Sequence, residues 1–447
     1  MPLDVYTLAK QAAIKIKKAD SNTRFRVISH YDADGITAAT IICKALYREG
    51  FDFHATLMRN PFTTGIESLK NEENTHIIFT DMGSGQLSMI EEINGQIIII
   101  DHHQLKKEKT KENILQINAN QCGINGNYEA CGATLSYAVA KALNKKNQDL
   151  ASYAIAGATG DKQYIGGFKG YNRTLIDDAV QYNAVSENIG LKLSEHSISE
   201  SLYYSVEPYY KGISGNHESI DSLLKKLKIN SEEQYSALSK DKKQQLHSYL
   251  MLCLIKQGCE SNILDTVIRT RYYAKHTFGE MEQFADLLDA CGKGGHRDIG
   301  LSLCLGDEKS YQKAKQHEKT FKQNLLESLC DIEKKGVKEK KSYRYFYTDN
   351  TSLGGVIGGI ATNFILDKEK PLFSIAKKQD ELHISGRGNQ YLVKKGLDLG
   401  GAMNAIATKF QGNGGGHSIA AGATLPIDIE EQFLKETDVL LSKQLGL

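Results

Sequence analysis

The amino-acid sequence predicts an α/β protein with three parts: a parallel-sheet domain, a largely helical insert and a smaller mixed α/β domain. In residues 1–185 short apolar runs alternate with helical patterns, which is the arrangement of βαβ units. Residues 186–340 carry mostly amphipathic, charge-rich helical patterns, and strand-like runs return in 341–447. A chain of 447 residues with 40% hydrophobic content is long enough to bury several cores.

Four apolar runs predict the strands of the first domain. They are FRVISH (25–30), FHATLM (53–58), HIIFTD (76–81) and QIIIID (96–101). The four consecutive isoleucines of the last run suit a strand that helices cover on both faces. Apolar residues at helical spacing predict helices over 36–49, from about Leu87, over 133–143 and over 150–161.

The rest of the chain changes character twice. The amphipathic segments SLLKKLKI (222–229), QQLHSYLMLCLI (244–255) and EMEQFADLLDACG (280–292) predict helices in the insert. Strands are then predicted over 343–347, 371–376, 381–386 and 421–426, interleaved with helices. A mixed α/β domain is the simplest arrangement of these last elements.

Composition excludes several classes of protein. No apolar run approaches the roughly 20 residues of a membrane span, and the N-terminus lacks the apolar centre of a signal peptide, so we expect a cytoplasmic protein without membrane contact. The eight cysteines include no C-x-x-C pair, so neither a zinc module nor a disulfide framework is expected. The net charge is +1, but residues 309–345 carry a local excess of positive charge, which indicates either a polyanion-facing surface or a solvated helix face.

Acidic and histidine residues follow three of the predicted strands, at the point where each strand ends. They are Asp32 and Asp34 after the first strand, Asp81 after the third, and Asp101, His102 and His103 after the fourth. Taken singly, each motif is also compatible with a turn, a helix cap or a polar strand exit. Because the carboxyl ends of parallel strands meet at one sheet edge, we expect these side chains to cluster. Clustered carboxylates require a compensating cation, and oxygen ligands with one or two imidazoles favour Mn²⁺ or Mg²⁺ over zinc.

These motifs also carry a family resemblance. HYDADG, TDMG, DHH and GATGD, in this order, resemble the four motifs of the DHH phosphoesterases. GNGGGHSIAAGA (412–423) resembles the substrate-binding DHHA1 domain of the same superfamily. FADLLDACGKGGHRDIGL (284–301) and GATGDKQ (157–163) are similar to archaeal RecJ-like nucleases, including those that accompany the GINS replication complex. The resemblance implies a DHH domain over 1–185, an insert over 186–340 and a DHHA1 domain over 341–447.

The resemblance implies a hydrolase of phosphodiester bonds that uses two divalent cations, with Mn²⁺ preferred over Mg²⁺. Asp32 would bind one cation, Asp34 the other, and Asp81 both. The further implied roles are those of His102 and Asp161 at the second cation, Asp101 in orienting the histidine pair, and His103 in facing the scissile phosphate. His30 is a candidate ligand, although it precedes the first aspartate by two residues, whereas some relatives have a spacing of four.

Candidate substrate-binding residues lie near the C-terminus. Gly414, Gly415 and Gly416 could bring backbone amides close to a phosphate, with His417 as a donor, although a tight turn also explains the glycines. Ser385 and Arg387 follow a predicted strand, and an arginine there could bind a phosphate with two hydrogen bonds or simply lie at the surface.

The resemblance and the long insert favour a single-strand-specific exonuclease on DNA or RNA in replication or repair, with the nucleic acid and the GINS complex as candidate partners. A phosphoesterase for short oligonucleotides or cyclic dinucleotides is one alternative, and a replication scaffold of the Cdc45 type is another. An inorganic pyrophosphatase is disfavoured by the insert and the changed histidine spacing. Strand polarity, the choice between DNA and RNA, and the oligomeric state stay open.

Overall fold

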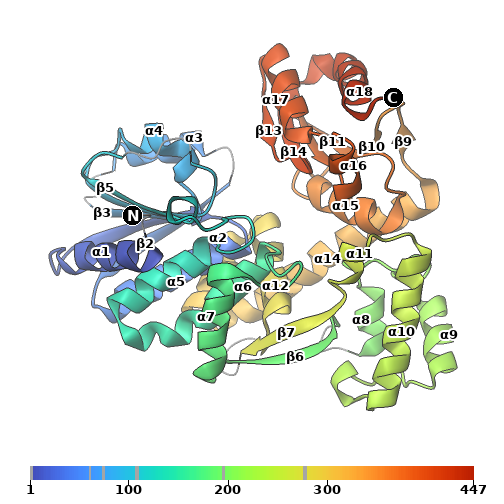
Figure 1. The fold of residues 1–447 in the computed structure, drawn as a ribbon, viewed down its shortest axis with the longest axis horizontal. Helices are drawn as coiled ribbons and strands as arrows, with labels where there is room; N and C mark the ends of the chain where they lie inside the picture. The colour runs from blue at the N-terminus through green and yellow to red at the C-terminus, as the bar shows by residue number, and fades with distance from the viewer. Residues whose placement is uncertain (1–3, 60–61, 73–75, 106–109, 194–196, 275–278) are drawn as a thin grey trace. The chain divides into compact units, whose positions relative to one another are not determined.

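The computed structural model describes residues 4–59, 62–72, 76–105, 110–193, 197–274 and 279–447. Contacts divide the chain into two compact units (Figure 1). The first comprises Met1–Gly190 and Arg269–Thr320, and the second comprises Leu191–Ile268 and Phe321–Leu447. The segment that was expected to form an insert therefore contributes residues to both units. Among the described residues, no helix has the length and apolar character needed to cross a membrane.

A five-stranded parallel sheet forms the centre of the first unit and confirms the predicted fold class. Its strands are β1 (Arg24–His30), β2 (Asp52–Met58), β3 (His76–Thr80), β4 (Gln96–Asp101) and β5 (Ile114–Asn118). Their order is β2-β1-β3-β4-β5, and every neighbouring pair is parallel. The strand β5 was not predicted, because its polar residues interrupt a run of only five residues. The strand order reverses between β1 and β3, and open α/β sheets bind ligands at such a point.

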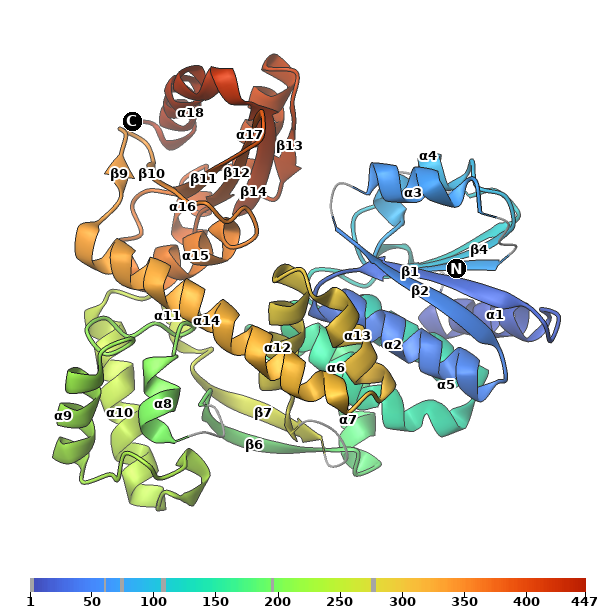
Figure 2. The ribbon, with the colours of Figure 1, turned by 180° about the vertical axis from the view of Figure 1, so that it is seen from behind.

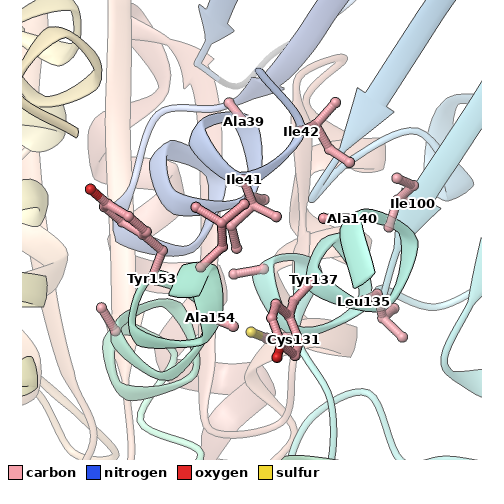
Figure 3. Close-up of a cluster of buried hydrophobic side chains, with 14 of the residues drawn as sticks. Ala39, Ile41, Ile42, Ile100, Cys131, Leu135, Tyr137, Ala140, Tyr153 and Ala154 are labelled. Atoms are coloured by element: carbon pink, nitrogen blue, oxygen red, sulfur yellow. The ribbon is translucent and has the colours of Figure 1, made fainter. Parts of the chain in front are cut away.

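Helices cover both faces of this sheet. The helices α1 (Val5–Lys17), α2 (Ala33–Arg48), α5 (Gly132–Leu143) and α6 (Ala151–Gly160) share one core with Ile98 and Ile100 of β4. On the other face, α3 (Thr63–Leu69) and α4 (Leu87–Ile90) pack with Ile97 and Ile99. The four isoleucines thus alternate between two cores, as expected of a strand that is covered on both sides. Figure 3 shows apolar side chains of α2, α5 and α6 meeting in the larger core.

The rest of the first unit comes from two parts of the chain. It contains α7 (Gly170–Gln181), α12 (Met281–Lys293), α13 (Arg297–Leu305) and the strands β6 (Val185–Leu191), β7 (Ile268–Ala274) and β8 (Gly279–Glu280), which form a three-stranded sheet. Helices α12 and α13 pack against α2, as Figure 2 shows. The helix α14 (Lys309–Lys335) begins in the first unit and ends in the second. Strands within 186–340 were not predicted, because charged residues break the apolar run of β7.

The second unit holds a mixed six-stranded sheet of order β13-β14-β12-β11-β10-β9. Its strands are β9 (Lys338–Glu339), β10 (Arg344–Tyr347), β11 (Leu372–Lys378), β12 (Glu381–Arg387), β13 (Asn413–Gly416) and β14 (Ala420–Pro426). Only β10 and β11 pair in parallel. The helices are α8 (Ile198–Tyr203), α9 (His217–Leu227), α10 (Lys240–Lys256), α11 (Ser261–Leu264), α15 (Gly354–Ile360), α16 (Gln390–Lys394), α17 (Leu399–Lys409) and α18 (Glu430–Leu445). The strands and helices of residues 341–447 have the predicted mixed α/β character, but the unit also includes Leu191–Ile268 and residues 321–340, which were expected to belong to the insert.

Candidate metal centre

The turn between β1 and α2 places two carboxylates at the edge of the sheet. Asp32 caps α2, and its Oδ1 accepts a hydrogen bond from the Gly35 amide at 3.1 Å. Asp34 lies in the first turn of the helix. A Cβ at Gly35 would lie 2.3 Å from the His30 carbonyl oxygen, so only glycine allows the chain to turn this tightly. The D-A-D-G pattern therefore has a steric basis in addition to its chemistry.

Asp34 lies in a buried backbone cradle and is only 1% exposed. Its two carboxylate oxygens accept hydrogen bonds from the first amides of α5, Gly132 at 2.7 Å and Ala133 at 2.8 Å. A Cβ at Gly157 would lie 2.6 Å from Oδ1, so small residues make room for this carboxylate. Burial, followed by the charges of Asp81 and Asp161, raises the pKa of Asp34 well above its usual value. A bound cation would allow the carboxylate to ionise.

Asp81 lies between two groups of ligating atoms. It follows β3 with φ of 54°, a conformation that non-glycine residues rarely adopt and that often occurs at functional sites. Its Oδ1 lies 3.1 Å from His102 Nε2, and its Oδ2 lies 3.6 Å from His30 Nδ1. Burial disfavours the charged form, but the hydrogen bonds from His102 and His30 outweigh it and hold the pKa of Asp81 below its usual value. Its two oxygens thus face in different directions.

His102 presents one ring nitrogen to three carboxylates. Its Nδ1 lies 2.6 Å from the Gly126 carbonyl oxygen, which only accepts, so Nδ1 carries a proton. Its Nε2 lies 3.1 Å from Asp81, 3.4 Å from Asp161 and 3.7 Å from Asp34. Burial opposes protonation of this ring, but the hydrogen bond with Asp81 and the charges of Asp161, Asp81 and Asp34 outweigh it and raise the pKa of His102 well above its usual value. A divalent cation among these oxygens would take the place of the proton on Nε2. The arrangement therefore fits a metal ligand.

Asp101 positions His102 and His103 through hydrogen bonds. It is fully buried, and its Oδ1 accepts hydrogen bonds from the His102 amide at 2.8 Å and from His103 Nδ1 at 2.8 Å. Its Oδ2 accepts the Ser84 amide at 2.8 Å. The His103 side chain remains 53% exposed. Asp101 therefore fixes the ring of His103 so that Nε2 is its remaining polar atom.

His30 and Asp161 complete the cluster. His30 Nδ1 lies 2.8 Å from Asp32 Oδ2, and no described residue hydrogen-bonds to its buried Nε2. Asp161 follows α6 as its C-terminal cap. Burial, together with the charges of Asp81 and Asp32, raises the pKa of Asp161 to about 7. This raised pKa is a further sign that the cluster contains more carboxylates than can ionise together without a cation.

The described side chains form three overlapping groups that fit divalent cations. Two of them share no residue: His30, Asp32 and Asp81 form one, and Asp34, His102 and Asp161 form the other. The third consists of Asp81, His102 and His103 and overlaps both; within each group, one ligating atom per residue lies within 4.8 Å of the others. The donors are carboxylate oxygens and imidazole nitrogens, which suit Mn²⁺ or Mg²⁺. The structure thus brings together all six residues that sequence analysis selected as ligands, at the point where the strand order reverses.

Two residues of α12 also reach this site and were missed by sequence reasoning. Asp289 Oδ1 accepts a hydrogen bond from the Ala33 amide at 2.8 Å, and Asp289 forms an ion pair with Lys293. Burial opposes ionisation of Asp32, but the charge and hydrogen bond of His30 and, to a smaller extent, the charge of Lys293 lower its pKa. The one residue in the sequence that could have pointed to this contact is Gly292, because a Cβ at that position would lie 1.8 Å from the Tyr31 carbonyl oxygen. This contact links α12 to the turn that carries Asp32.

In the second unit, Ser385 and Arg387 lie on the same face of β12. Both side chains lie against Gly355 of α15. A Cβ added at Gly355 would be 2.5 Å from Nη2 of the Arg387 guanidinium and 3.6 Å from the Cβ of Ser385. Nη1 donates to the Gly386 carbonyl oxygen at 2.9 Å, and no carboxylate among the described residues pairs with the guanidinium. Burial lowers the pKa of Arg387. An unpaired, partly buried cation of this kind suits an anionic ligand.

The glycine run lies in the edge strand β13 and not in a loop. Gly414 approaches α17 so closely that a Cβ would lie 2.5 Å from the Met403 carbonyl oxygen, and at Gly416 it would lie 2.6 Å from the Ala420 carbonyl oxygen. Packing alone therefore requires two of the glycines. His417 is exposed, and its amide donates to Ala420 in the turn that leads to β14. A role for this segment in binding phosphate stays a prediction.

Comparisons with known proteins place this geometry in a family. Residues 24–160 match the DHH family, N-terminal domain, and residues 341–443 match the DHHA1 domain. An uncharacterized protein of Methanocaldococcus jannaschii is 31% identical over 440 residues, covering 97% of this chain and 96% of that protein.

Two solved structures share the fold at low sequence identity. RecJ from Thermus thermophilus in complex with Mn²⁺ has a TM-score of 0.61 and 15% identity, with 99% of this chain and 55% of RecJ covered. This chain thus spans about half the length of that RecJ. CDC45 from Entamoeba histolytica has a TM-score of 0.68 and 14% identity, with 99% and 100% covered. From both domain matches and the relative that spans almost its full length, the chain belongs to the DHH family and carries a DHHA1 domain.

Proposed function

We propose that this protein is a two-metal-dependent phosphodiesterase that removes nucleotides from an end of single-stranded DNA or RNA. The position of Asp81 carries the proposal, because its two oxygens face His30 and His102, which belong to different groups of ligating residues. His30 and Asp32 would hold one cation, Asp34, His102 and Asp161 the other, and Asp81 both. When bound, such cations lower the pKa of water and neutralise charge that develops on a phosphoryl group.

His103 and Asp101 would act on the substrate side of this centre. The Asp101 carboxylate accepts the proton of His103 Nδ1, which leaves Nε2 of the half-exposed ring to donate to a phosphate oxygen. Burial opposes protonation of His103, but the charge of Asp101 outweighs it and raises the pKa of His103. A protonated imidazole is a better donor to an anionic substrate than a neutral one.

The second unit would bind other phosphates of the strand. Arg387 supplies an unpaired guanidinium next to Ser385, while His417 and the amides of Gly414, Gly415 and Gly416 are further candidates. In the first unit, the exposed lysines Lys313 and Lys319 of α14 would add sequence-independent attraction to the nucleic-acid backbone. Arg344 also lies in the positively charged segment 309–345, but it forms ion pairs with Glu339 and Asp367 and is therefore not available to a phosphate.

A role in DNA replication or repair, with the GINS complex as a partner, is the broader part of the proposal. It is supported by the fold shared with RecJ and with CDC45. The residues that would bind metal are all present, which favours an enzyme over a scaffold without catalytic activity.

The test is hydrolysis of end-labelled single-stranded DNA, single-stranded RNA, a blunt duplex and a dinucleotide, each with Mn²⁺, Mg²⁺ or EDTA. We expect stepwise shortening of single strands with Mn²⁺ or Mg²⁺, none with EDTA, and a resistant duplex. Equal rates on duplex and single strand would refute strand specificity. A strong preference for the dinucleotide would indicate a small-substrate phosphoesterase, and no hydrolysis under any condition would indicate a scaffold.

A further inference from the structure

A polar pocket adjoins the candidate metal centre in the first unit. It has a volume of about 350 Å³ and is lined chiefly by His102, Gln104, Asn120, Ile124, Asn125 and Asn127. This volume is at the lower end of the range of about 300–1,000 Å³ that is typical of small-ligand sites. His102 therefore takes part in both the pocket and the cluster of carboxylates.

Hydrogen bonds attach the walls of this pocket to the two histidines. The carbonyl of Gly126 accepts from His102 Nδ1 at 2.6 Å, and a Cβ at Gly126 would lie 2.0 Å from the His102 carbonyl oxygen. Asn120 Nδ2 donates to the carbonyls of His102 and His103, at 3.1 and 3.2 Å. The loop that carries the asparagines is thus held in a fixed position next to the metal centre.

Two of the lining amides are not used within the protein. The side chains of Gln104 and Asn127 are exposed and form no hydrogen bond with any described residue. By contrast, Asn125 Oδ1 accepts the Asn127 amide at 2.9 Å, and Asn120 is bound to the histidine backbone. Gln104 and Asn127 therefore each offer a donor and an acceptor to a ligand.

The chemistry of the lining points to an uncharged, polar, planar ligand. Apart from His102, which belongs to the metal centre, none of the described lining residues has an ionisable side chain, so the rest of the pocket suits an uncharged ligand better than a phosphate or a metal ion. Carboxamides pair with the donor and acceptor groups on the edges of nucleobases, and Ile124 supplies an apolar contact for a base face. We propose that this pocket binds the base of the nucleotide whose phosphate lies at the metal centre. The inference rests on the proposed function and specifies how its substrate is held.

Binding of reaction products tests this without turnover. Calorimetry on the Mn²⁺-loaded full chain would compare the four common nucleoside 5′-monophosphates with ribose 5-phosphate, which lacks a base. We expect at least one nucleotide to bind about tenfold more tightly than ribose 5-phosphate. Asn127→Ala and Gln104→Ala should each weaken nucleotide binding by about three- to tenfold and leave ribose 5-phosphate binding unchanged.

Matched controls separate the pocket from general effects. Asn71→Ala and Gln181→Ala remove exposed amides of the same unit that do not line the pocket, and they should leave both affinities unchanged. Equal binding of nucleotides and ribose 5-phosphate, or an unchanged difference in both pocket variants, would overturn the inference. If single strands are hydrolysed but the base adds no affinity, only this inference fails; if nucleotides bind through their bases but no diester is hydrolysed, the proposed function fails instead.

Discussion

Two regions of the molecule contain charged groups whose charges the protein itself does not fully balance, and the charges are of opposite sign. One is the edge of the parallel sheet in the first unit, with its carboxylates; the other, called the α15 face, is the side of β12 that carries Arg387 and packs against α15 in the second unit. At the sheet edge, Asp34, Asp81 and Asp161 crowd around His102, and burial and mutual repulsion raise the pKa values of Asp34 and Asp161. On the α15 face, Arg387 has no carboxylate partner among the described residues, and burial lowers its pKa.

This difference indicates which ligand each region requires. Burying an uncompensated charge costs free energy, so such groups persist where a ligand of opposite charge offsets the cost. The sheet edge thus fits divalent cations, and the α15 face fits an anion such as a phosphate. Substitutions in the two regions should consequently affect different quantities: metal binding and turnover in the first, substrate affinity in the second.

The largest effect is expected at the sheet edge. Asp81→Asn should lower the rate of phosphodiester hydrolysis at least about a hundredfold, because it weakens the ligand that faces both groups, while Tm changes little since no apolar packing is lost. Asp52→Asn removes an exposed carboxylate of the same unit and should have no effect. Retention of more than about a hundredth of the rate, with unchanged metal content, would contradict a shared ligand.

A smaller effect is expected on the α15 face. Arg387→Met keeps much of the side-chain volume but removes the charge, and it should raise KM for a single strand about ten- to hundredfold while metal content stays constant. Arg344→Met is the contrasting control, because Arg344 is already paired with Glu339 and Asp367; it should lower Tm and leave KM unchanged. If both variants behaved alike in steady-state kinetics and melting experiments, the contrast between paired and unpaired arginine would be wrong.

Protons should compete with the cation at the sheet edge. The pKa of Asp161 is raised to about 7, so below that pH a proton must leave the carboxyl before a cation binds. Mn²⁺ affinity should therefore fall about fivefold between pH 7 and pH 6, with a shallower pH dependence in Asp161→Asn. Calorimetric titrations at several pH values would measure this. An affinity that is independent of pH over this range would show that Asp161 is not a ligand.

The smallest effect concerns α14, where the charge is exposed. Lys313→Gln and Lys319→Gln together should reduce the salt dependence of single-strand binding by about 0.7 log units per log unit of salt for each lysine that contacts a phosphate. Cleavage of a dinucleotide should not change. Fluorescence anisotropy over a salt series would measure the slope. An unchanged slope would mean that these lysines only solvate the helix.

The sequence predicted those features that depend on local patterns. The apolar runs of β1 to β4 and the carboxylates at their ends predicted the parallel sheet and the clustering of Asp32, Asp34 and Asp81, because parallel strands end at one edge. The short strand β5 was missed, since Gln116 and Asn118 interrupt its pattern and are buried next to Ser84. A polar residue that is buried with a partner gives no apolar signal.

Features that depend on distant contacts could not be predicted in this way. Asp289 contacts the backbone of Ala33, although 256 residues separate the two in the chain. The glycines of β13 suggested phosphate binding, because backbone amides without side chains can approach a phosphate closely; the folded structure adds a second reason for Gly414, which is its close packing against α17. That Arg387 lacks a carboxylate partner also follows only from the folded arrangement.

We propose that Asp81 binds two cations at the edge of the sheet, and electron paramagnetic resonance of the full chain titrated with Mn²⁺, in the wild type and in Asp81→Asn, would test this. We expect two Mn²⁺ ions per chain with a spin-coupled spectrum, and loss of that coupling in Asp81→Asn. One Mn²⁺ per chain, or two uncoupled ions that the substitution does not affect, would contradict it.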